Sequence, residues 1–155
     1  MTDSQGIIRY LKRVRHIDKE IDATQQAADA IYHKLTSIKT STIKDVNVQE
    51  SNRTTTEDRI VQYVDMQEKV DKMVDELVDL KDKIMTEINQ MDDTVHKSIL
   101  IRRYILSESW SEVSEAINYS PRRTTTLHGT ALIEFYNENR QEVDDYIKRC
   151  AKNRL

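Results

Sequence analysis

Apolar residues recur every three or four positions along the first part of the chain, which is the spacing of one helix face. With Ile7 at position a of a heptad, all a and d positions as far as Ile38 are apolar except Thr24. The positions are Ile7, Tyr10, Val14, Ile17, Ile21, Thr24, Ala28, Ile31, Leu35 and Ile38. A seam of this length is typical of a coiled coil, so it predicts a long helix with a partner helix.

A second heptad pattern begins near Thr56, after a stretch at about residues 40–56 whose polar content predicts a loop. Extra apolar residues flank this seam, as is typical of a helix with more than one neighbour. The seam residues are Ile60, Tyr63, Val70, Val74, Leu77, Ile84, Ile88, Met91 and Val95, with Gln67 and Lys81 at two a positions. Polar residues at seam positions lower stability but fix register or oligomeric state. The two patterns predict a long antiparallel helical hairpin that forms a coiled coil.

Between Ile99 and Leu132 the helical pattern shortens, and start and stop signals appear. Ser109 followed by Glu112 fits a capping box at a helix start. An apolar stripe then runs through Trp110, Val113, Ala116 and Ile117. Asn tolerates the left-handed backbone that often ends a helix, and Asn118 stands at that point. Ser120 and Pro121 next suit the cap and first residue of another helix.

The two short helices and their tight turn have the layout of a DNA-reading helix-turn-helix. On the second helix, Thr124, Leu127 and Ala131 share one face, and the polar residues fall elsewhere, where they can point outward. Arg can bond a guanine edge, and Thr can contact bases or phosphates. The candidate DNA-binding residues are therefore Ser120, Arg122, Arg123, Thr125, Thr126 and His128, with Arg102 and Arg103 on the preceding helix as candidate phosphate contacts. Arg103 fits a structural role equally well, and a solvated face is the alternative for the rest.

Residues 100–132 resemble region 4 of bacterial sigma factors. The matching features are Arg103–Tyr104, the helix from Trp110 to Ile117, Tyr119–Ser120, and Arg122 to Leu127 followed by His128 and Gly129. The closest resemblance is to the sigma-like late-transcription regulators of phages that infect low-GC Gram-positive bacteria, related to the autolysin-regulator (ArpU) type. Those proteins also place a long helical part before the sigma-like end. One departure is Thr124, at a buried position where the family has an aliphatic residue.

Composition narrows the fold class. One proline and two glycines among 155 residues leave little material for the turns of a sheet-rich fold. We therefore expect an all-α protein, with a coiled-coil or oligomerisation region at residues 1–93 and a helix-turn-helix domain at 94–155. The single cysteine, Cys150, excludes an internal disulfide framework. Its spacing to Tyr146 and Ile147 predicts a small buried hydrophobe rather than a reactive thiol.

Charge is divided unevenly along the chain. Residues 57–93 carry 12 acidic and 5 basic residues, a net charge of −7, whereas residues 94–132 carry 5 basic and 3 acidic, a net charge of +2. Tight DNA binding by one copy usually needs a more basic surface. We therefore expect a homo-oligomer, a dimer or higher, or binding beside another DNA-bound protein.

Catalytic and metal-binding patterns are not found. The four histidines are scattered, the only cysteine is far from them, and no glycine-rich phosphate loop is present. We expect no enzyme activity and no cofactor. No apolar run reaches the length of a signal peptide or a membrane span, so we expect a protein of the host bacterial cytoplasm without membrane partners.

The expected function is sequence-specific binding to double-stranded DNA, with activation of phage late genes as the resemblance implies. Host RNA polymerase is a further candidate partner. Two alternatives remain: a small-terminase-like binder of a packaging site, and a protein-interaction module that docks RNA polymerase or a repressor without touching DNA. Small terminases usually place the DNA-binding part first, which is the reverse of the order here.

Overall fold

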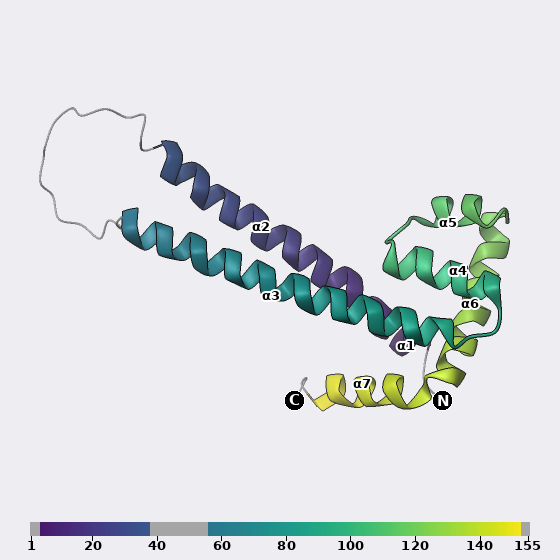
Figure 1. The fold of residues 1–155 in the computed structure, drawn as a ribbon. Helices are drawn as coiled ribbons and strands as arrows, with labels where there is room; N and C mark the ends of the chain where they lie inside the picture. The colour runs from purple at the N-terminus through teal and green to yellow at the C-terminus, as the bar shows by residue number, and fades with distance from the viewer. Residues whose placement is uncertain (1–3, 38–55, 153–155) are drawn as a thin grey trace, which may run out of the picture. The chain divides into compact units, whose positions relative to one another are not determined.

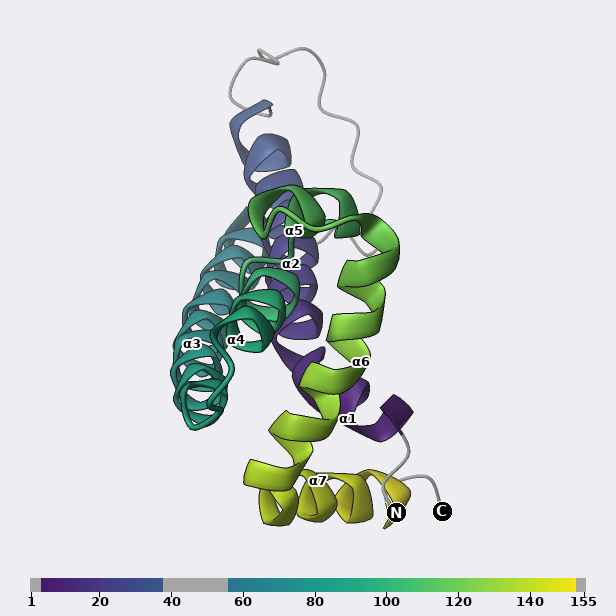
Figure 2. The same ribbon diagram turned by 90° about the vertical axis from the view of Figure 1, so that its right-hand side faces the viewer.

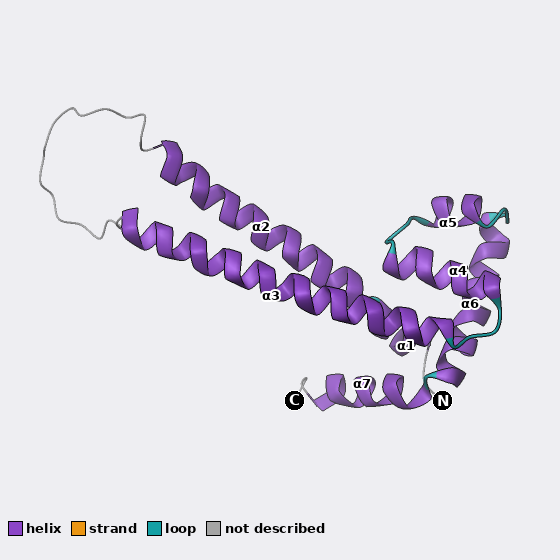
Figure 3. Ribbon diagram, in the orientation of Figure 1, coloured by secondary structure: helices purple, strands orange, loops and turns teal. Residues whose placement is uncertain are grey.

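The computed structural model describes residues 4–37 and 56–152, and within these ranges every regular element is a helix (Figure 1, Figure 3). The all-α class is thereby confirmed for the described part of the chain. The elements are α1 (Ser4–Leu11), α2 (Arg13–Ser37), α3 (Thr56–Asn89), α4 (Thr94–Leu100), the π-helical turn η2 (Ile101–Ile105), α5 (Trp110–Ala116), α6 (Pro121–Glu138) and α7 (Arg140–Lys152). The loop expected at residues 40–56 falls almost wholly outside the described residues; α3 begins at Thr56, as predicted.

The described helices divide into two compact units. One contains the described parts of residues 1–17 and 77–155, and the other contains residues 18–76. This division does not coincide with the boundary expected at residues 93 and 94, because α1, the start of α2 and the part of α3 from Leu77 onward belong with the C-terminal helices. Within this first unit, α6 contacts α1, α4, α5 and α7. It runs from α5 to α7 (Figure 2).

The first unit has a dense apolar core. Its fully buried side chains come from every helix and include Leu11, Ile84, Ile99, Val113, Phe135 and Val143. The Phe135 ring lies 6.1 Å from the ring of Tyr10, and the Tyr146 ring meets Tyr10 edge-on at 5.4 Å. These contacts tie the N-terminal helix to the two C-terminal helices, a pairing between chain ends that no local pattern predicts.

A buried polar cluster crosses the same core. The Tyr10 hydroxyl donates to the Glu87 carboxylate at 2.7 Å, and the Asn139 side-chain amide donates to the backbone carbonyls of Glu87 and Phe135. Burial raises the pKa of both Tyr10 and Glu87. These two carbonyls also accept the backbone N–H groups of Gln90 and Asn139, so the Asn139 amide adds a bond that links the end of α6 to α3.

The first heptad pattern predicts burial well. Every a and d position from Ile7 to Leu35 is buried or half-buried, and Ile38 lies outside the described residues. The expected single helix is interrupted at Lys12, between α1 and α2. Besides its seam positions Ile7 and Tyr10, α1 buries Leu11 completely in the first unit.

The second heptad pattern is only half right. Its d positions Val70, Leu77 and Ile84 and its a position Ile88 are buried, but the a positions Ile60 and Val74 are exposed. Buried or half-buried Met66, Met73 and Leu80 take their place, so the packed face of α3 is rotated from the predicted seam. In the second unit, α3 meets α2 at Tyr63, whose ring lies 5.6 Å from the ring of Tyr32.

Candidate nucleic-acid interface

Helix α5 begins as the sequence predicts. The Ser109 hydroxyl accepts from the Glu112 backbone N–H, and the Glu112 carboxylate accepts from the Ser109 N–H at 2.7 Å. This capping box satisfies two donors that would otherwise be free at the helix start. The predicted apolar stripe is correct at Val113, which is fully buried, but wrong at Ala116, which is exposed. Ser114 is buried instead, and its hydroxyl donates to the Trp110 carbonyl at 2.7 Å.

The turn between α5 and α6 is defined by backbone hydrogen bonds. Asn118 has φ 56, the left-handed conformation expected of it. The Tyr119 N–H bonds the Ser114 carbonyl, and the Asn118 N–H bonds the Glu115 carbonyl, both at 3.1 Å. These two bonds make a Schellman motif, which ends α5 and redirects the chain. Helix α6 follows with Ser120 as N-cap and Pro121 in its first turn, as predicted.

The inner face of α6 holds the two helices together. Thr124 and Ala131 are fully buried, and Leu127 is half-buried, as expected. The Thr124 hydroxyl donates to the Ser120 carbonyl at 3.0 Å. A threonine is therefore accommodated at this buried position, because its polar atom keeps a hydrogen bond.

His128 is the clear correction to the predicted site. It was expected to point outward, but its side chain is buried, only 8 % exposed. Its ring meets the Trp110 ring edge-on at 4.7 Å, and its Nε2 lies 2.9 Å from the Tyr104 hydroxyl. Because an α-helix turns about 100° per residue, His128 lies on nearly the same face of α6 as Thr124. The aromatic side chains of Trp110 on α5 and Tyr104 on η2 cover the His128 ring.

The protonation states at His128 follow from burial. Burial, aided by the nearby Arg103 charge, lowers the pKa of His128 to about 4. Burial also raises the pKa of Tyr104 to about 12. At neutral pH the imidazole is uncharged and the phenol keeps its proton, so one hydrogen bond joins the hydroxyl and Nε2. His128 therefore acts as a structural residue between η2, α5 and α6.

The two arginines of η2 are engaged within the fold. Arg103 donates to the Glu108 carbonyl at 2.7 Å, and its guanidinium lies 4.7 Å from the centre of the Trp110 ring. Arg102 forms an ion pair with the Glu108 carboxylate at 3.0 Å. These contacts fit the structural alternative for Arg103 and give Arg102 the same kind of role.

The outer face of α6 presents the other four polar residues together. Arg122, Arg123, Thr125 and Thr126 are exposed within the first two turns of the helix. Neither arginine forms an ion pair with another residue in the part of the chain that the structure describes. The hydroxyls of Thr125 and Thr126 donate to backbone carbonyls one turn back. Their methyl groups and oxygen lone pairs remain available to a ligand.

Sequence reasoning missed how α4 is attached to α6. Asp93 caps α4 by accepting from the backbone N–H groups of Val95 and His96. Glu134 of α6 accepts from the N–H groups of Asp92 and Asp93 and pairs with the imidazole of His96. Burial opposes ionisation of Glu134, but these hydrogen bonds prevail and lower its pKa. The cap could have been recognised from Asp93 before Thr94, whereas nothing local links residues 96 and 134.

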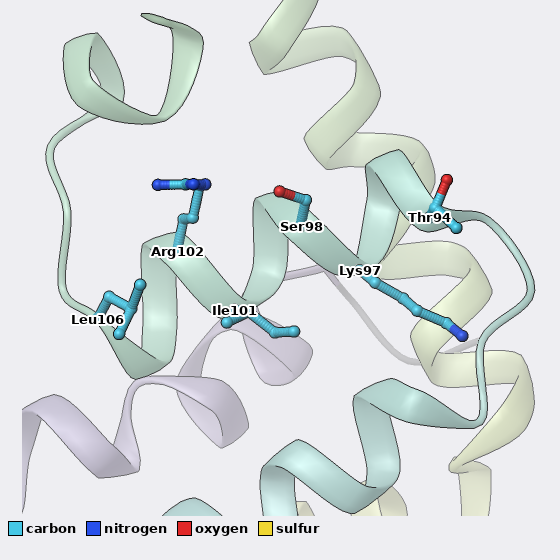
Figure 4. A pocket seen from close by; sticks show the side chains of 6 residues that line it. All are labelled: Thr94, Lys97, Ser98, Ile101, Arg102 and Leu106. Atoms are coloured by element: carbon cyan, nitrogen blue, oxygen red, sulfur yellow. The ribbon is translucent and has the colours of Figure 1, made fainter. Parts of the chain in front are cut away.

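A hollow of about 340 Å³ lies on the outer side of α4 and η2 (Figure 4). Six side chains line it: Thr94, Lys97, Ser98, Ile101, Arg102 and Leu106. It holds no carboxylate or histidine, so it offers no general base. Across the described residues, no group of His, Cys, Asp and Glu is arranged to hold a metal ion. No described helix is both long and apolar enough to cross a membrane.

Comparison with protein-family models, with curated protein sequences and with solved structures finds no match to this chain. The resemblance to sigma region 4 and to phage late-transcription regulators therefore stays a prediction, and the functional argument depends on the geometry of α5 and α6.

Proposed function

We propose that the protein is a sequence-specific DNA-binding transcriptional regulator in which α5 and α6 form a helix-turn-helix. The observation that carries the proposal is the division of α6 into two faces. Its inner face is buried against α5 and η2, and its outer face presents exposed Arg122 and Arg123 with Thr125 and Thr126. A helix of this kind fits the major groove, where such side chains distinguish base pairs.

The start of α6 supports the same role. Ser120 caps the helix through the Arg123 N–H at 3.3 Å, and Pro121 has no N–H to donate. The Arg122 N–H and the positive end of the helix dipole therefore face outward, where they favour a phosphate. His128, Arg102 and Arg103 are left out of the contact set because their side chains are engaged inside the fold.

Activation of phage late genes is the form of regulation that the sequence resemblance implies, and we retain it as part of the proposal. The acidic stretch at 57–93 leaves the whole chain with a net charge of −3. Non-specific attraction to DNA is therefore weak, and base contacts from more than one copy are needed for a stable complex. A homo-oligomer joined through the long helices supplies those copies.

Selection from a library of random-sequence DNA duplexes tests the proposal. We expect the wild-type chain to enrich a shared motif that contains a G·C pair for each groove-facing arginine. A matched pair of variants identifies the surface: Arg122→Ala/Arg123→Ala removes two charges from α6, and Lys148→Ala/Arg149→Ala removes two from α7. Only the second variant should enrich the same motif. The absence of any motif with the wild-type chain would contradict the proposal.

A second candidate function is docking of another protein without DNA contact, which the hollow beside Leu106 favours. Leu106 is 58 % exposed and lies between the helices of the sigma-like region. If this function is correct, Leu106→Asp should abolish transcriptional activity and Arg122→Ala/Arg123→Ala should preserve it. The DNA-binding proposal predicts that the double arginine variant loses activity.

A further inference from the structure

The helix α3 carries an uncovered apolar stripe. Five of the nine exposed large apolar side chains in the described residues lie on this one helix, each 40–57 % exposed: Ile60, Val61, Val64, Val74 and Val78. All but Val61 share a single face, because their spacings are close to whole helical turns. The packed face of the helix, which includes Val70 and Leu77, is separate and buried. Apolar side chains aligned in this way mark an interaction surface.

We propose that this stripe is the interface between two copies of the chain, in which the two α3 helices pack antiparallel. The stripe includes four polar residues as well as four apolar ones, in the order Glu57, Ile60, Val64, Gln67, Asp71, Val74, Val78 and Lys81. The spacings alternate between three and four residues along one continuous helix. This alternation is the a/d spacing of a coiled-coil seam. It shares Ile60, Gln67, Val74 and Lys81 with the seam predicted from the sequence, but it faces away from the buried side of the helix.

The eight residues form compatible pairs when the seam packs against a second copy that runs in the opposite direction. When the seam is paired antiparallel about its midpoint, Ile60 lies opposite Val78 of the second copy, and Val64 lies opposite Val74 of the second copy. The same register places Glu57 opposite Lys81 of the second copy, so opposite charges meet at both ends. Gln67 lies opposite Asp71 of the second copy, and its amide can donate to that carboxylate.

Parallel packing lacks this complementarity. An in-register parallel pair would place Glu57 against Glu57, Asp71 against Asp71 and Lys81 against Lys81. Like charges that face each other across a seam destabilise the pair. The antiparallel register removes all three clashes while it keeps the apolar contacts.

The edges of the stripe limit the strength of the interface. Glu68 and Asp75 lie on the Val61 side of the seam, so the flank is acidic in both copies. Their mutual repulsion makes the dimer reversible rather than permanent. The side of α3 that packs in its own chain is already buried, so the contact is one helix wide.

This inference specifies the oligomer on which the proposed function rests. Each copy carries its own α6, so a dimer supplies the two recognition helices that the proposed function requires.

The mass of the full chain in solution without DNA tests the interface independently of DNA binding. We expect a concentration-dependent dimer from sedimentation. Val64→Glu/Val74→Glu should weaken dimerisation about 100-fold or more, because buried apolar contacts are replaced by charges. The control Ile133→Glu changes an equally exposed residue of α6 and should leave the dimer unchanged. A wild-type chain that stays monomeric at all concentrations would overturn the inference and assign the stripe to another protein.

Charge reversal tests the register without disturbing the apolar contacts. Glu57→Lys alone and Lys81→Glu alone should each weaken the dimer several-fold, since each creates a like-charge pair. The double variant Glu57→Lys/Lys81→Glu should recover wild-type dimerisation. Failure of the double variant to recover, with its helix content unchanged, would contradict this register.

Cross-linking distinguishes antiparallel from parallel packing. In a Cys150→Ser background, a mixture of Val64→Cys and Val74→Cys chains should form a disulfide-linked dimer on oxidation. Neither variant alone should do so, because in the antiparallel pair the same position of the two chains is offset by about ten residues. At 1.5 Å per residue, the two identical cysteines are about 15 Å apart along the helix axis. Cross-linking of either variant with itself would establish parallel packing and overturn the proposal.

Discussion

The two compact units of this protein enclose their apolar side chains to different degrees. The unit that contains the C-terminal helices buries Tyr10, Phe135 and Val143 completely, and its buried polar groups are hydrogen-bonded with few exceptions. In the described part of the unit formed by residues 18–76, Ala28 is the only fully buried apolar side chain, and Tyr32, Ile60 and Val64 are largely exposed. The difference teaches that the first unit has a closed core, whereas the second encloses its apolar side chains only in part.

Removal of an aromatic ring from each unit gives the largest expected effect. Phe135→Ala should lower the free energy of unfolding by about 3–5 kcal/mol, because it opens a cavity in a closed core. Tyr32 is 51 % exposed and contacts the Tyr63 ring, so Tyr32→Ala should cost about 1 kcal/mol. Denaturant unfolding of both variants measures the two values. Equal losses would break the distinction between the units.

Acid should affect the first unit through His128. The pKa of its imidazole is about 4 in the folded protein, below the ordinary 6.5, so the unfolded chain binds the proton more readily. The stabilising contribution of neutral His128 is fully present above pH 6.5 and is lost as the pH falls toward 4. Its full size is on the order of 3 kcal/mol.

Nuclear magnetic resonance titration of the imidazole measures this pKa directly. The acid-induced fall in unfolding free energy should also be smaller in His128→Gln than in the wild-type chain. An imidazole that titrates at pH 6 or above would mean that His128 is solvated, as the sequence alone suggested.

A smaller effect is expected at the turn between α5 and α6. Asn118 has φ 56, which costs a residue with an ordinary side chain about 1 kcal/mol. Asn118→Ala should therefore lower the unfolding free energy by about that amount, while Asn118→Gly should change it by only a few tenths. Thermal unfolding of the two variants makes the comparison. An alanine variant as stable as the glycine variant would show that the turn does not depend on this conformation.

Local signals allowed much of the fold to be predicted from the sequence. The capping box at Ser109, the left-handed Asn118 and the Ser120–Pro121 start all depend on residues within one turn of each other, and all three are present. Heptad spacing predicted the burial of α1 and α2 for the same reason. The face of α3 was harder, because apolar residues surround most of that helix and spacing alone does not select the packed side.

The error at His128 has a physical origin. Its partners, Tyr104 and Trp110, lie on other elements, so the sequence gives no sign that the side chain is enclosed. Tyr104, 24 residues away, and Trp110 cover His128, and Glu134 reaches His96 over 38 residues. Only Arg122, Arg123, Thr125 and Thr126 keep the outward position that helical spacing gave them.

The affinity of the full chain for its selected duplex tests the central claim, that the outer face of α6 reads DNA. We predict that Arg122→Ala/Arg123→Ala lowers affinity about 100-fold. The slope of log affinity against log salt concentration should also become shallower in this variant, by up to about two. The control Lys148→Ala/Arg149→Ala, which removes the same charge from α7, should bind close to wild type. If the α6 variant binds with unchanged affinity and salt dependence, α6 is not the recognition helix and the account is wrong.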